Sequence, residues 1–475
     1  MARMNREHVH FIGIGGVGMS AVAKILIDSG STVTGSDEAV YEPVASYLTL
    51  SGISYKTPYA AENIPTDVNR IVVGKNAKLT KENNAEVREA YARGVPVISY
   101  PEMLAELAQN SEQIVIAGSY GKSTATALIA HCLTEANLDP SYFIGAVPFS
   151  PSESGHTGTG NLFVLEGDEY PSSNEDPRSK FLHFSPRHLL LTPLSHDHLN
   201  IFPTEEAYLA PFVELIAKVP ADGSVTVALS GELSKKFLAD TNRNATTYSV
   251  SEGDWHASNI VYGAPTTFSI LNNGKHIVDI STQELGSHAV ENIIGVAALL
   301  LGQSLITAEQ FAGAISSFKG IRRRLDLKST KTSVRIYEGF GSSIEKAKAA
   351  IAAMKLHFPD RRLLIAFEPH TFSWRNRGAL PWYDSVFAGA AEVFVYEPPS
   401  HGAGTHDQIN LEEIVARVQS AGIKAVGVEN AEAGLSAIAQ TLTADDVILI
   451  LTSGDMGGMV EALPKLAEEH YPKQT

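Results

Sequence analysis

Two glycine-rich turns constrain this chain more than any other feature, because each lies between a short apolar strand and a helix. The first, Gly13-Ile14-Gly15-Gly16-Val17-Gly18, follows the apolar run His8–Ile12. The second, Gly118-Ser119-Tyr120-Gly121-Lys122-Ser123-Thr124, follows Gln113–Ala117. A glycine turn from a strand into a helix presents backbone amides at a helix N-terminus, where phosphate groups bind. The chain is therefore predicted to be an α/β protein with two phosphate-binding turns.

The alternation of apolar strands and helices continues to the end of the chain and predicts three domains. A length of 475 residues fits this number at roughly 150 residues per domain. We expect a Rossmann-like domain over residues 1–110, a P-loop ATPase-like central domain over 111–325 and a second Rossmann-like domain over 326–475. In the central part, Asn272-Asn273-Gly274 separates two alternating runs and predicts a hairpin within a small antiparallel sheet.

Composition limits the partners of the chain. The formal net charge of −16 opposes general binding to nucleic acid or to anionic lipid. The single cysteine, Cys132, excludes an internal disulfide and fits a reducing compartment. The longest apolar run, near Ile293–Leu301, is much shorter than the roughly 20 residues that cross a bilayer. We expect a cytoplasmic protein, a monomer or homodimer, with no nucleic-acid or membrane partner.

The first turn has the G-x-G-x-x-G spacing of dinucleotide-binding sites. Asp37 ends the next strand, 24 positions after Gly13, where a ribose-binding carboxylate is expected. By itself this pattern favours an NAD-dependent dehydrogenase, although it does not distinguish NAD from other nucleotide diphosphates. A glycine turn that serves only packing is the structural alternative.

The second turn indicates ATP chemistry. Gly121-Lys122-Ser123 has a Walker A ending, in which the lysine faces the β- and γ-phosphates and the hydroxyl binds Mg²⁺. Glu166-Gly167-Asp168-Glu169 follows the strand Leu162–Leu165, and carboxylates at a strand end suit a magnesium site. Asp197-His198 follows the strand His188–Leu191, and His198 could bind a second metal ion. A structural histidine and a solvated acidic turn are the plain alternatives.

The order of these motifs resembles the Mur ligase family, whose members use ATP to join an amino acid or a peptide to a UDP-muramyl precursor of peptidoglycan. The ATP loop of the family is matched by Gly118–Thr124, its acidic motif by Glu166–Glu169 and its Asp-His pair by Asp197-His198. Gly286–Asn292 resembles the segment near the adenine, and Phe318–Arg324 resembles the segment that supplies an arginine to ATP. Only this resemblance accounts for both turns, because a dehydrogenase explains the first alone and a P-loop ATPase or a folate-type polyglutamate ligase explains the second alone.

The resemblance implies a set of site residues and the cofactor Mg²⁺. ATP is expected to contact Gly118, Ser119, Tyr120, Gly121, Lys122, Ser123, Thr124, His288, Asn292 and Arg323. The UDP group of UDP-N-acetylmuramate is expected at Gly13, Gly15, Gly16, Val17, Gly18 and Asp37. Magnesium is expected at Ser123, Glu166 and His198, and the catalytic set is Lys122, Glu166, His198 and Arg323.

The acceptor amine is predicted from finer similarities. The 32 positions between Glu166 and His198, together with Asp168-Glu169-Tyr170 and Arg178–His183, resemble the member of the family that adds the recovered peptide L-Ala-γ-D-Glu-meso-diaminopimelate during peptidoglycan recycling. We therefore expect that peptide as the acceptor, with L-alanine in peptidoglycan biosynthesis as the alternative. His370 and Arg375 are the acceptor-side predictions, because a peptide carboxylate suits a guanidinium.

One segment departs from the family. Both kinds of member usually carry Asp-Asp-Phe/Tyr-Gly/Ala-His-His-Pro after the central domain, and here the aligned stretch is Tyr337-Glu338-Gly339-Phe340-Gly341-Ser342-Ser343-Ile344. Both histidines and the proline are missing. An altered acceptor or a non-catalytic homologue therefore stays open beside the two ligase activities.

Overall fold

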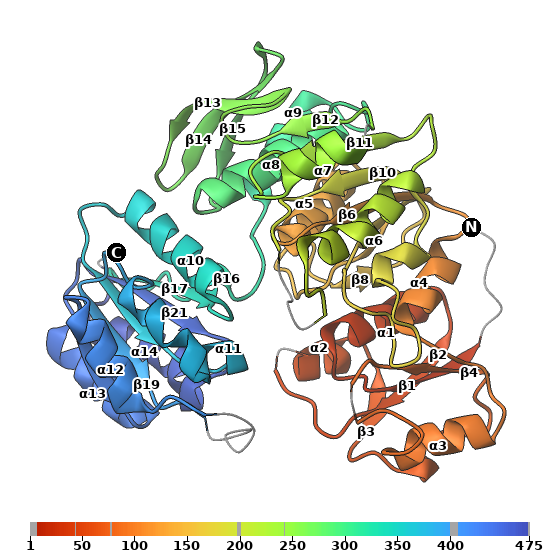
Figure 1. Ribbon diagram of the computed structural model, residues 1–475, viewed down its shortest axis with the longest axis horizontal. Coiled ribbons are helices and arrows are strands. Elements are labelled where there is room, and N and C mark those ends of the chain that lie inside the picture. Colours follow the sequence, from red (N-terminus) through yellow and green to blue (C-terminus); the bar gives the residue numbers. More distant parts are fainter. Residues whose placement is uncertain are drawn as a thin grey trace. The chain divides into compact units, whose positions relative to one another are not determined.

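The computed structural model contains three sheets that follow one another along the chain (Figure 1). It describes residues 7–42, 44–76, 78–196, 201–241, 243–399 and 407–473. These residues form two compact units, one made mostly of residues 1–321 and one mostly of residues 322–475. The first unit holds the first two sheets and the second unit holds the third. The sheets alternate with helices, which confirms the predicted α/β class.

The first sheet is fully parallel, in the order β3-β2-β1-β4-β5. Side chains of β1 alternate between two cores: Val9 and Phe11 pack with Val22 of α1, whereas Ile12 packs with Val87 of α3. Helices therefore cover both faces, as expected for a parallel sheet. The elements are β1 (His8–Ile12), α1 (Val17–Asp28), β2 (Thr32–Ser36), α2 (Val44–Leu50), β3 (Ser54–Lys56), β4 (Arg70–Val73), α3 (Ala85–Ala92), β5 (Val97–Ile98) and α4 (Tyr100–Ala108).

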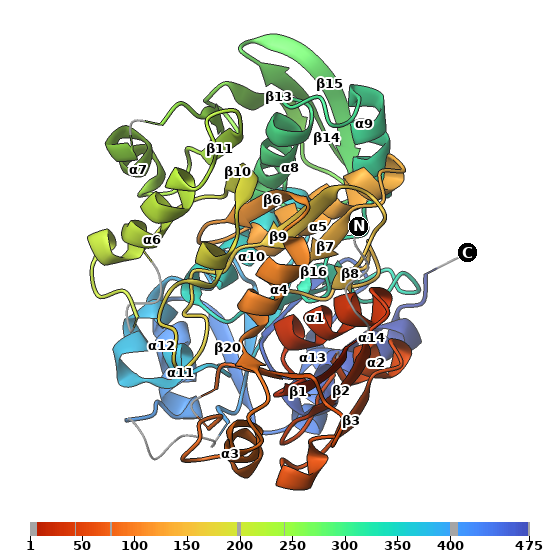
Figure 2. The same ribbon diagram turned by 90° about the vertical axis from the view of Figure 1, so that its right-hand side faces the viewer.

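The second sheet has the order β15-β14-β13-β12-β11-β10-β6-β9-β7-β8. Figure 2 shows α5 beside β6 and β9, and α9 beside β15. The elements are β6 (Glu112–Ala117), α5 (Lys122–Glu135), β7 (Ser141–Phe143), β8 (Gly155–His156), β9 (Leu162–Glu166), β10 (Pro186–Leu191), α6 (Glu205–Ala217), β11 (Ser224–Ala228), α7 (Ser234–Thr241), β12 (Thr246–Tyr248), β13 (Trp255–Val261), β14 (Thr266–Asn272), β15 (Lys275–Thr282), α8 (Ser287–Leu300) and α9 (Ala308–Ser317).

The predicted hairpin is present, and its strands are attached to the parallel strands of the central sheet, which they extend. Asn273 and Gly274 connect β14 to β15, and both have positive φ angles, of 49° and 76°. A two-residue turn with both φ angles positive matches the right-handed twist of the flanking strands. The residue pattern therefore predicted the turn correctly.

The third sheet has the order β16-β17-β21-β18-β19-β20, in which β16 runs antiparallel to β17 and the other neighbouring strands pair in parallel. Ile365 of β18 faces the core that contains Ile351 of α10, and Leu364 faces the core that contains Leu463 of α14. The elements are β16 (Arg324–Leu327), β17 (Arg335–Phe340), α10 (Ile344–His357), β18 (Leu363–Phe367), α11 (Phe372–Arg375), β19 (Glu392–Tyr396), α12 (Leu411–Ser420), β20 (Lys424–Val428), α13 (Ala431–Thr441), β21 (Val447–Thr452) and α14 (Met459–His470).

Direct contacts join the first two sheets within their unit. The hydroxyl of Thr157 donates to the carbonyl of Ile25 at the end of α1, at 2.8 Å. The ring of Tyr100, at the start of α4, lies 5.9 Å from the ring of Phe143, at the end of β7. The glycine turn that follows β1 is therefore attached to the central sheet that carries the second turn.

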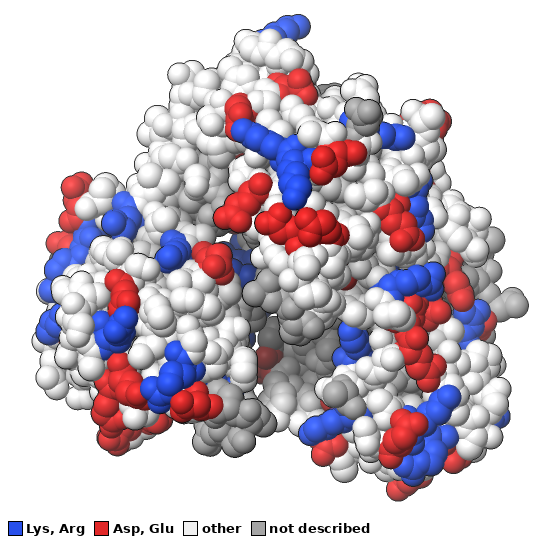
Figure 3. Space-filling view, in the orientation of Figure 1, with Lys and Arg blue, Asp and Glu red and all other residues white. Residues whose placement is uncertain are grey.

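The surface mixes charges of both signs. Acidic and basic side chains are interspersed on the face shown in Figure 3. Among the described residues, no helix combines the length and apolar character needed to cross a membrane.

Candidate active site

Three strand ends bring the predicted ATP residues to one edge of the central sheet. In the register of the sheet, Ile116 of β6 pairs with Glu166 of β9, and Ala117 of β6 pairs with Leu191 of β10. The second glycine turn, the acidic motif and the segment after β10 therefore leave the sheet side by side. Ligands of open parallel sheets bind at this edge, outside the carboxyl ends of the strands.

The second turn has a backbone that glycine accommodates best. Gly118 has φ of +136°, and a Cβ there would lie 2.3 Å from Oγ1 of Thr192. Gly121 is the N-cap of α5 with φ of +88°, and a Cβ would lie 2.5 Å from Oδ1 of Asn292. The structure thus brings Asn292, from α8, against the turn. Tyr120 is 42% exposed, and Thr124 is half-buried in the first turn of α5.

Lys122 is held by an acidic residue and by the turn itself. Its ammonium lies 2.8 Å from Oε2 of Glu169 and donates to the carbonyl of Gly118. Burial alone would lower the pKa of Lys122, but Glu169 and Asp168 outweigh burial and raise it. Lys122 is therefore protonated, as a phosphate-binding lysine must be.

Glu166 lies beside Ser123 in an arrangement that suits a hard cation. The Ser123 hydroxyl donates to Oε1 of Glu166 at 2.7 Å, and the amide of Gly145 donates to Oε2 at 2.6 Å. Both side chains are buried. Carboxylate and hydroxyl oxygens are the ligands that Mg²⁺ prefers, so the residues fit the expected ion.

Ser119 connects the turn to the segment after β10. Its hydroxyl donates to the carbonyl of Ser195 at 2.8 Å, accepts from the Ser195 amide at 2.7 Å and lies 2.5 Å from the hydroxyl of Tyr208. The predicted pair Asp197-His198 lies outside the described residues. Ser119 fixes the chain two residues before that pair.

The first turn contacts Asp37, the residue that the spacing predicts to bind a ribose. The amides of Gly13 and Ile14 donate to the carbonyl of Ser36, and the amide of Gly15 donates to Oδ2 of Asp37 at 2.7 Å. A Cβ on Gly15 would lie 2.8 Å from that oxygen, so the close approach requires glycine. The hydroxyl of Tyr59 donates to Oδ1 of Asp37 at 3.0 Å.

The remaining residues of the first turn lead toward the central sheet. Gly16 is the N-cap of α1 and Val17 is its first residue. A Cβ on Gly18 would lie 3.3 Å from Cζ of Tyr100 and 3.5 Å from Cζ of Phe143. The predicted UDP residues are therefore gathered at one turn, next to α4.

The buried carboxylate of Glu86 lies next to this turn. Glu86, which is fully buried on α3, lies 2.8 Å from Nε2 of His10 and accepts from the hydroxyl of Ser36 at 2.6 Å. The carboxylate thus links β1, β2 and α3, and its partner Ser36 directly precedes Asp37. No pattern in the sequence indicated this role for Glu86.

Arg323 lies in the second compact unit and contacts the altered segment Tyr337–Ile344. Its Nε donates to Oε1 of Glu338 at 2.8 Å, and Nη2 donates to the carbonyl of Gly454 at 2.6 Å. Lys328 donates to the other oxygen of Glu338 at 2.9 Å. Glu338, which stands where the family usually has aspartate, therefore binds two cations at the end of β17.

The acceptor-side predictions have different surroundings. Nδ1 of His370 lies 3.1 Å from the hydroxyl of Ser453. A Cβ on Gly454 would lie 2.6 Å from Glu368 and 2.7 Å from His370. These residues gather at the carboxyl ends of β18 and β21. Arg375 is buried instead, and its Nη1 donates to the carbonyl of Pro399 at 2.7 Å. Burial lowers the pKa of Arg375. Its guanidinium is thus used in a hydrogen bond within the protein.

His288 lies at the start of α8, in the part of that helix that belongs to the second unit. A Cβ on Gly286 would lie 2.7 Å from the His288 ring, and the amide of Gly286 donates to Nε2 of His357 at 2.9 Å. Asn292 is four residues further along the same helix and belongs to the first unit.

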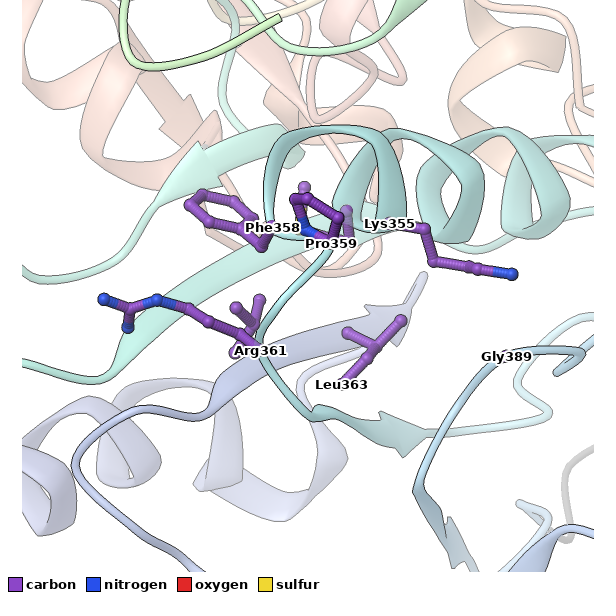
Figure 4. Close-up of a pocket in the computed structure, with 8 residues that line it drawn as sticks. Lys355, Phe358, Pro359, Arg361, Leu363 and Gly389 are labelled. Atoms are coloured by element: carbon purple, nitrogen blue, oxygen red, sulfur yellow. The ribbon is translucent and has the colours of Figure 1, made fainter.

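A small hollow in the third sheet lies at the other ends of its strands (Figure 4). Leu363 and Val447, the first residues of β18 and β21, line it together with Phe358. Lys355 and Arg361 extend to opposite sides. None of the predicted site residues lines this hollow.

Sequence reasoning missed Lys180 and Lys75 as members of the site. Lys180 donates to Asp168 of the acidic motif at 2.5 Å, and both amines lie 5.8 Å from the ring centroid of Tyr170. The sequence carried two signals, namely Tyr170 directly after the acidic motif and the segment Arg178–His183, which contains Lys180.

Comparisons with known proteins agree along nearly the whole chain. A model described as the Mur ligase family catalytic domain matches residues 8–112, and one described as the Mur ligase middle domain matches residues 116–300. UDP-N-acetylmuramate–L-alanine ligase of Endomicrobium trichonymphae is 30% identical over 456 residues, which cover 95% of this chain and 97% of that protein.

Two solved structures share the fold. UDP-N-acetylmuramate–alanine ligase of Thermotoga maritima matches with a TM-score of 0.79 at 23% identity, over 97% of this chain and 98% of that chain. A murein peptide ligase of Psychrobacter arcticus matches with a TM-score of 0.68 at 24% identity, over 97% and 99%. Both confirm the three-domain α/β architecture.

Proposed function

Because this chain belongs to the Mur ligase family of ATP-dependent, ADP-forming amide ligases, we propose that it joins L-alanine to UDP-N-acetylmuramate. The observation that carries the proposal is the 30% identity to an L-alanine ligase across 95% of this chain. This acceptor replaces the recovered peptide as the leading hypothesis, because the spacing and short segments that favoured the peptide cover only a small part of the chain.

The proposed reaction has two steps. The carboxylate of UDP-N-acetylmuramate attacks the γ-phosphorus of ATP, which releases ADP and leaves an acyl phosphate. The amine of L-alanine then attacks the acyl carbon, inorganic phosphate leaves and the nitrogen loses a proton. Such chemistry requires positioning and stabilisation of negative charge more than covalent help from the protein.

The residues of the second turn take the ATP. Lys122 and the amides at the N-terminus of α5 hold the β- and γ-phosphates, and Asn292 lies at the same turn. Ser123 and Glu166 would hold one Mg²⁺, and His198 a second. The ion supplies positive charge beside the phosphates when it is bound. Arg323 neutralises charge on the transferred group.

The first turn takes the UDP group, with the diphosphate at the N-terminus of α1, where the amides of Val17 and Gly18 lie, and with Asp37 toward the ribose. On the acceptor side we assign His370, which lies beside Glu368 and Gly454. Glu368 and His370 lie at the strand ends of the third sheet. They offer a carboxylate that can bind an ammonium group next to an imidazole. Arg375 stays a weaker proposal, since its guanidinium is buried.

The test offers two acceptors in parallel. Purified protein receives UDP-N-acetylmuramate, ATP and Mg²⁺ with either L-alanine or L-Ala-γ-D-Glu-meso-diaminopimelate, and phosphate release is measured. We expect release that depends on L-alanine and that is absent in Lys122→Met. Release with the tripeptide alone would instead support peptide recycling. Binding of both nucleotides without release for either acceptor would support a non-catalytic or altered-acceptor homologue.

A further inference from the structure

Lys180 lies between the two glycine turns and belongs to neither. It is the first residue of a short 3-10 helix, Lys180–His183, and its side chain is 14% exposed. Its ammonium donates to Oδ2 of Asp168 at 2.5 Å and lies 5.4 Å from the ring centroid of Tyr100. Two separate elements, the acidic motif and α4, therefore hold the amine.

Each neighbour of Lys180 leads to one of the turns. Tyr100 lies against Gly18, where a Cβ would be 3.3 Å from the tyrosine ring. Asp168 precedes Glu169, whose carboxylate lies 2.8 Å from Lys122. All of these residues belong to the same compact unit. The Lys180 ammonium therefore lies between the first turn and the phosphate-binding Lys122.

A second lysine, Lys75, lies near Lys180, and both amines are 5.8 Å from the ring centroid of Tyr170. Lys75 follows Gly74, which lies 3.7 Å from a Cβ built on Gly13. Burial and the charge of Lys180 both lower the pKa of Lys75. For Lys180, burial alone would lower the pKa, but Tyr100 and Asp168 outweigh burial and raise it. Lys180 therefore carries a persistent charge in a place where a substrate anion can meet it.

We propose that Lys180 binds the lactyl carboxylate of UDP-N-acetylmuramate and directs it toward the γ-phosphate. The inference rests on the proposed function, because it assumes this substrate. The UDP group occupies the first turn and the γ-phosphate lies at Lys122, so the carboxylate must cross the space between them. A charge-assisted bond from a fixed ammonium orients that carboxylate for attack. Lys122 itself is taken by the phosphates of ATP.

Two UDP-sugars distinguish the carboxylate from the rest of the substrate. UDP-N-acetylglucosamine has the same UDP group and the same sugar ring without the lactyl carboxylate. Titration calorimetry with the full chain measures both ligands for the wild type, Lys180→Met and Lys180→Arg. Lys235→Met is the matched control, because Lys235 is likewise ion-paired, at 2.6 Å to Glu252, but lies exposed on α7.

In Lys180→Met we expect affinity for UDP-N-acetylmuramate to fall by about tenfold or more, and affinity for UDP-N-acetylglucosamine to change less than about twofold. Lys180→Arg keeps the charge and should retain most of the affinity. Lys235→Met should bind both sugars like the wild type. ATP binding, measured in the same preparations, should be unchanged and shows that each variant is folded.

Two outcomes overturn the inference alone. An equal loss for both sugars would mean that Lys180 contacts the diphosphate or supports the fold, and unchanged affinity in Lys180→Met would mean that it contacts neither sugar. Failure of the wild type to bind UDP-N-acetylmuramate would remove the proposed function together with the inference. That failure is visible before any substitution is made.

Discussion

The ammonium of Lys122 lies 2.8 Å from Oε2 of Glu169, a carboxylate whose side chain is only 1% exposed. The lysine proposed to bind the γ-phosphate is thus held by the protein through a buried ion pair. Removing one partner of a buried pair leaves a desolvated charge, which costs far more than the pair contributes. Variants of the two residues can therefore separate the structural effect of the ion pair from the catalytic effect of Lys122.

Lys122→Met should destabilise the protein by about 3 kcal/mol, because Glu169 is left buried without this cation. Adding Glu169→Gln removes the uncompensated charge and should recover more than half of the loss. Midpoints of urea unfolding measure both effects. Phosphate release should be absent from the single and the double variant alike, since neither has the lysine. Recovery of activity in the double variant would contradict the role of Lys122.

Asp37→Ala removes the acceptor of the Gly15 amide and of the Tyr59 hydroxyl. We expect the affinity for UDP-N-acetylmuramate to fall by about tenfold, because hydrogen bonds to charged groups contribute roughly 1.5–3 kcal/mol. The affinity for ATP should stay the same. Tyr59→Phe is the control that removes only one of the two bonds and should have a smaller effect. Fluorescence titration with NADH should show no binding to the wild type, and binding would revive the dehydrogenase interpretation.

The sequence predicted features that depend on neighbours along the chain. Both glycine turns were predicted because the geometry of a strand–turn–helix connection is local. The charged stretch over residues 80–93 is typical of a helix in composition, but α3 begins only at Ala85, because the Asn84 side chain accepts from the amides of Glu86 and Val87 and caps it there. Charged stretches before such a cap resemble helix in composition but do not join it.

Long-range contacts explain what the sequence missed. Lys75 and Lys180 are far apart in the chain and meet only because the first two sheets form one unit. Glu86 binds the hydroxyl of Ser36 from a helix whose sequence resembles an ordinary solvated one. Arg323 likewise has partners that are distant in the chain, because Glu338 lies on β17 and Gly454 follows β21. The spacing of residues along the chain does not indicate such long-range contacts.

Gly145→Ala should disturb the proposed magnesium residue without touching either turn. A Cβ at this position would lie 2.8 Å from Oε1 and 2.9 Å from Cδ of Glu166, so the carboxylate must leave the position in which it accepts from Ser123. We expect the Mg²⁺ concentration for half-maximal phosphate release to rise several-fold, with UDP-N-acetylmuramate affinity unchanged. Gly313→Ala on α9 is the matched control, because a Cβ there meets nothing within 4 Å. An unchanged Mg²⁺ requirement would argue against Glu166 as a ligand.

Asp326→Asn should stabilise the protein at neutral pH and leave it unchanged in acid. Burial and the nearby Glu338 raise the pKa of Asp326 from 3.8 to about 6, against the opposing effect of Lys328. The folded state therefore favours the protonated carboxyl of Asp326. The stability that the wild type gains from it is complete below about pH 4 and is lost as pH rises through 6. A shift of this size corresponds to about 3 kcal/mol. The gain in unfolding free energy of the variant over the wild type should grow between pH 4 and 7 and then level off. Asp360→Asn, which removes an exposed carboxylate of the same unit, should give no such gain, and a pH-independent gain in Asp326→Asn would show that the ionised carboxylate is not the cause.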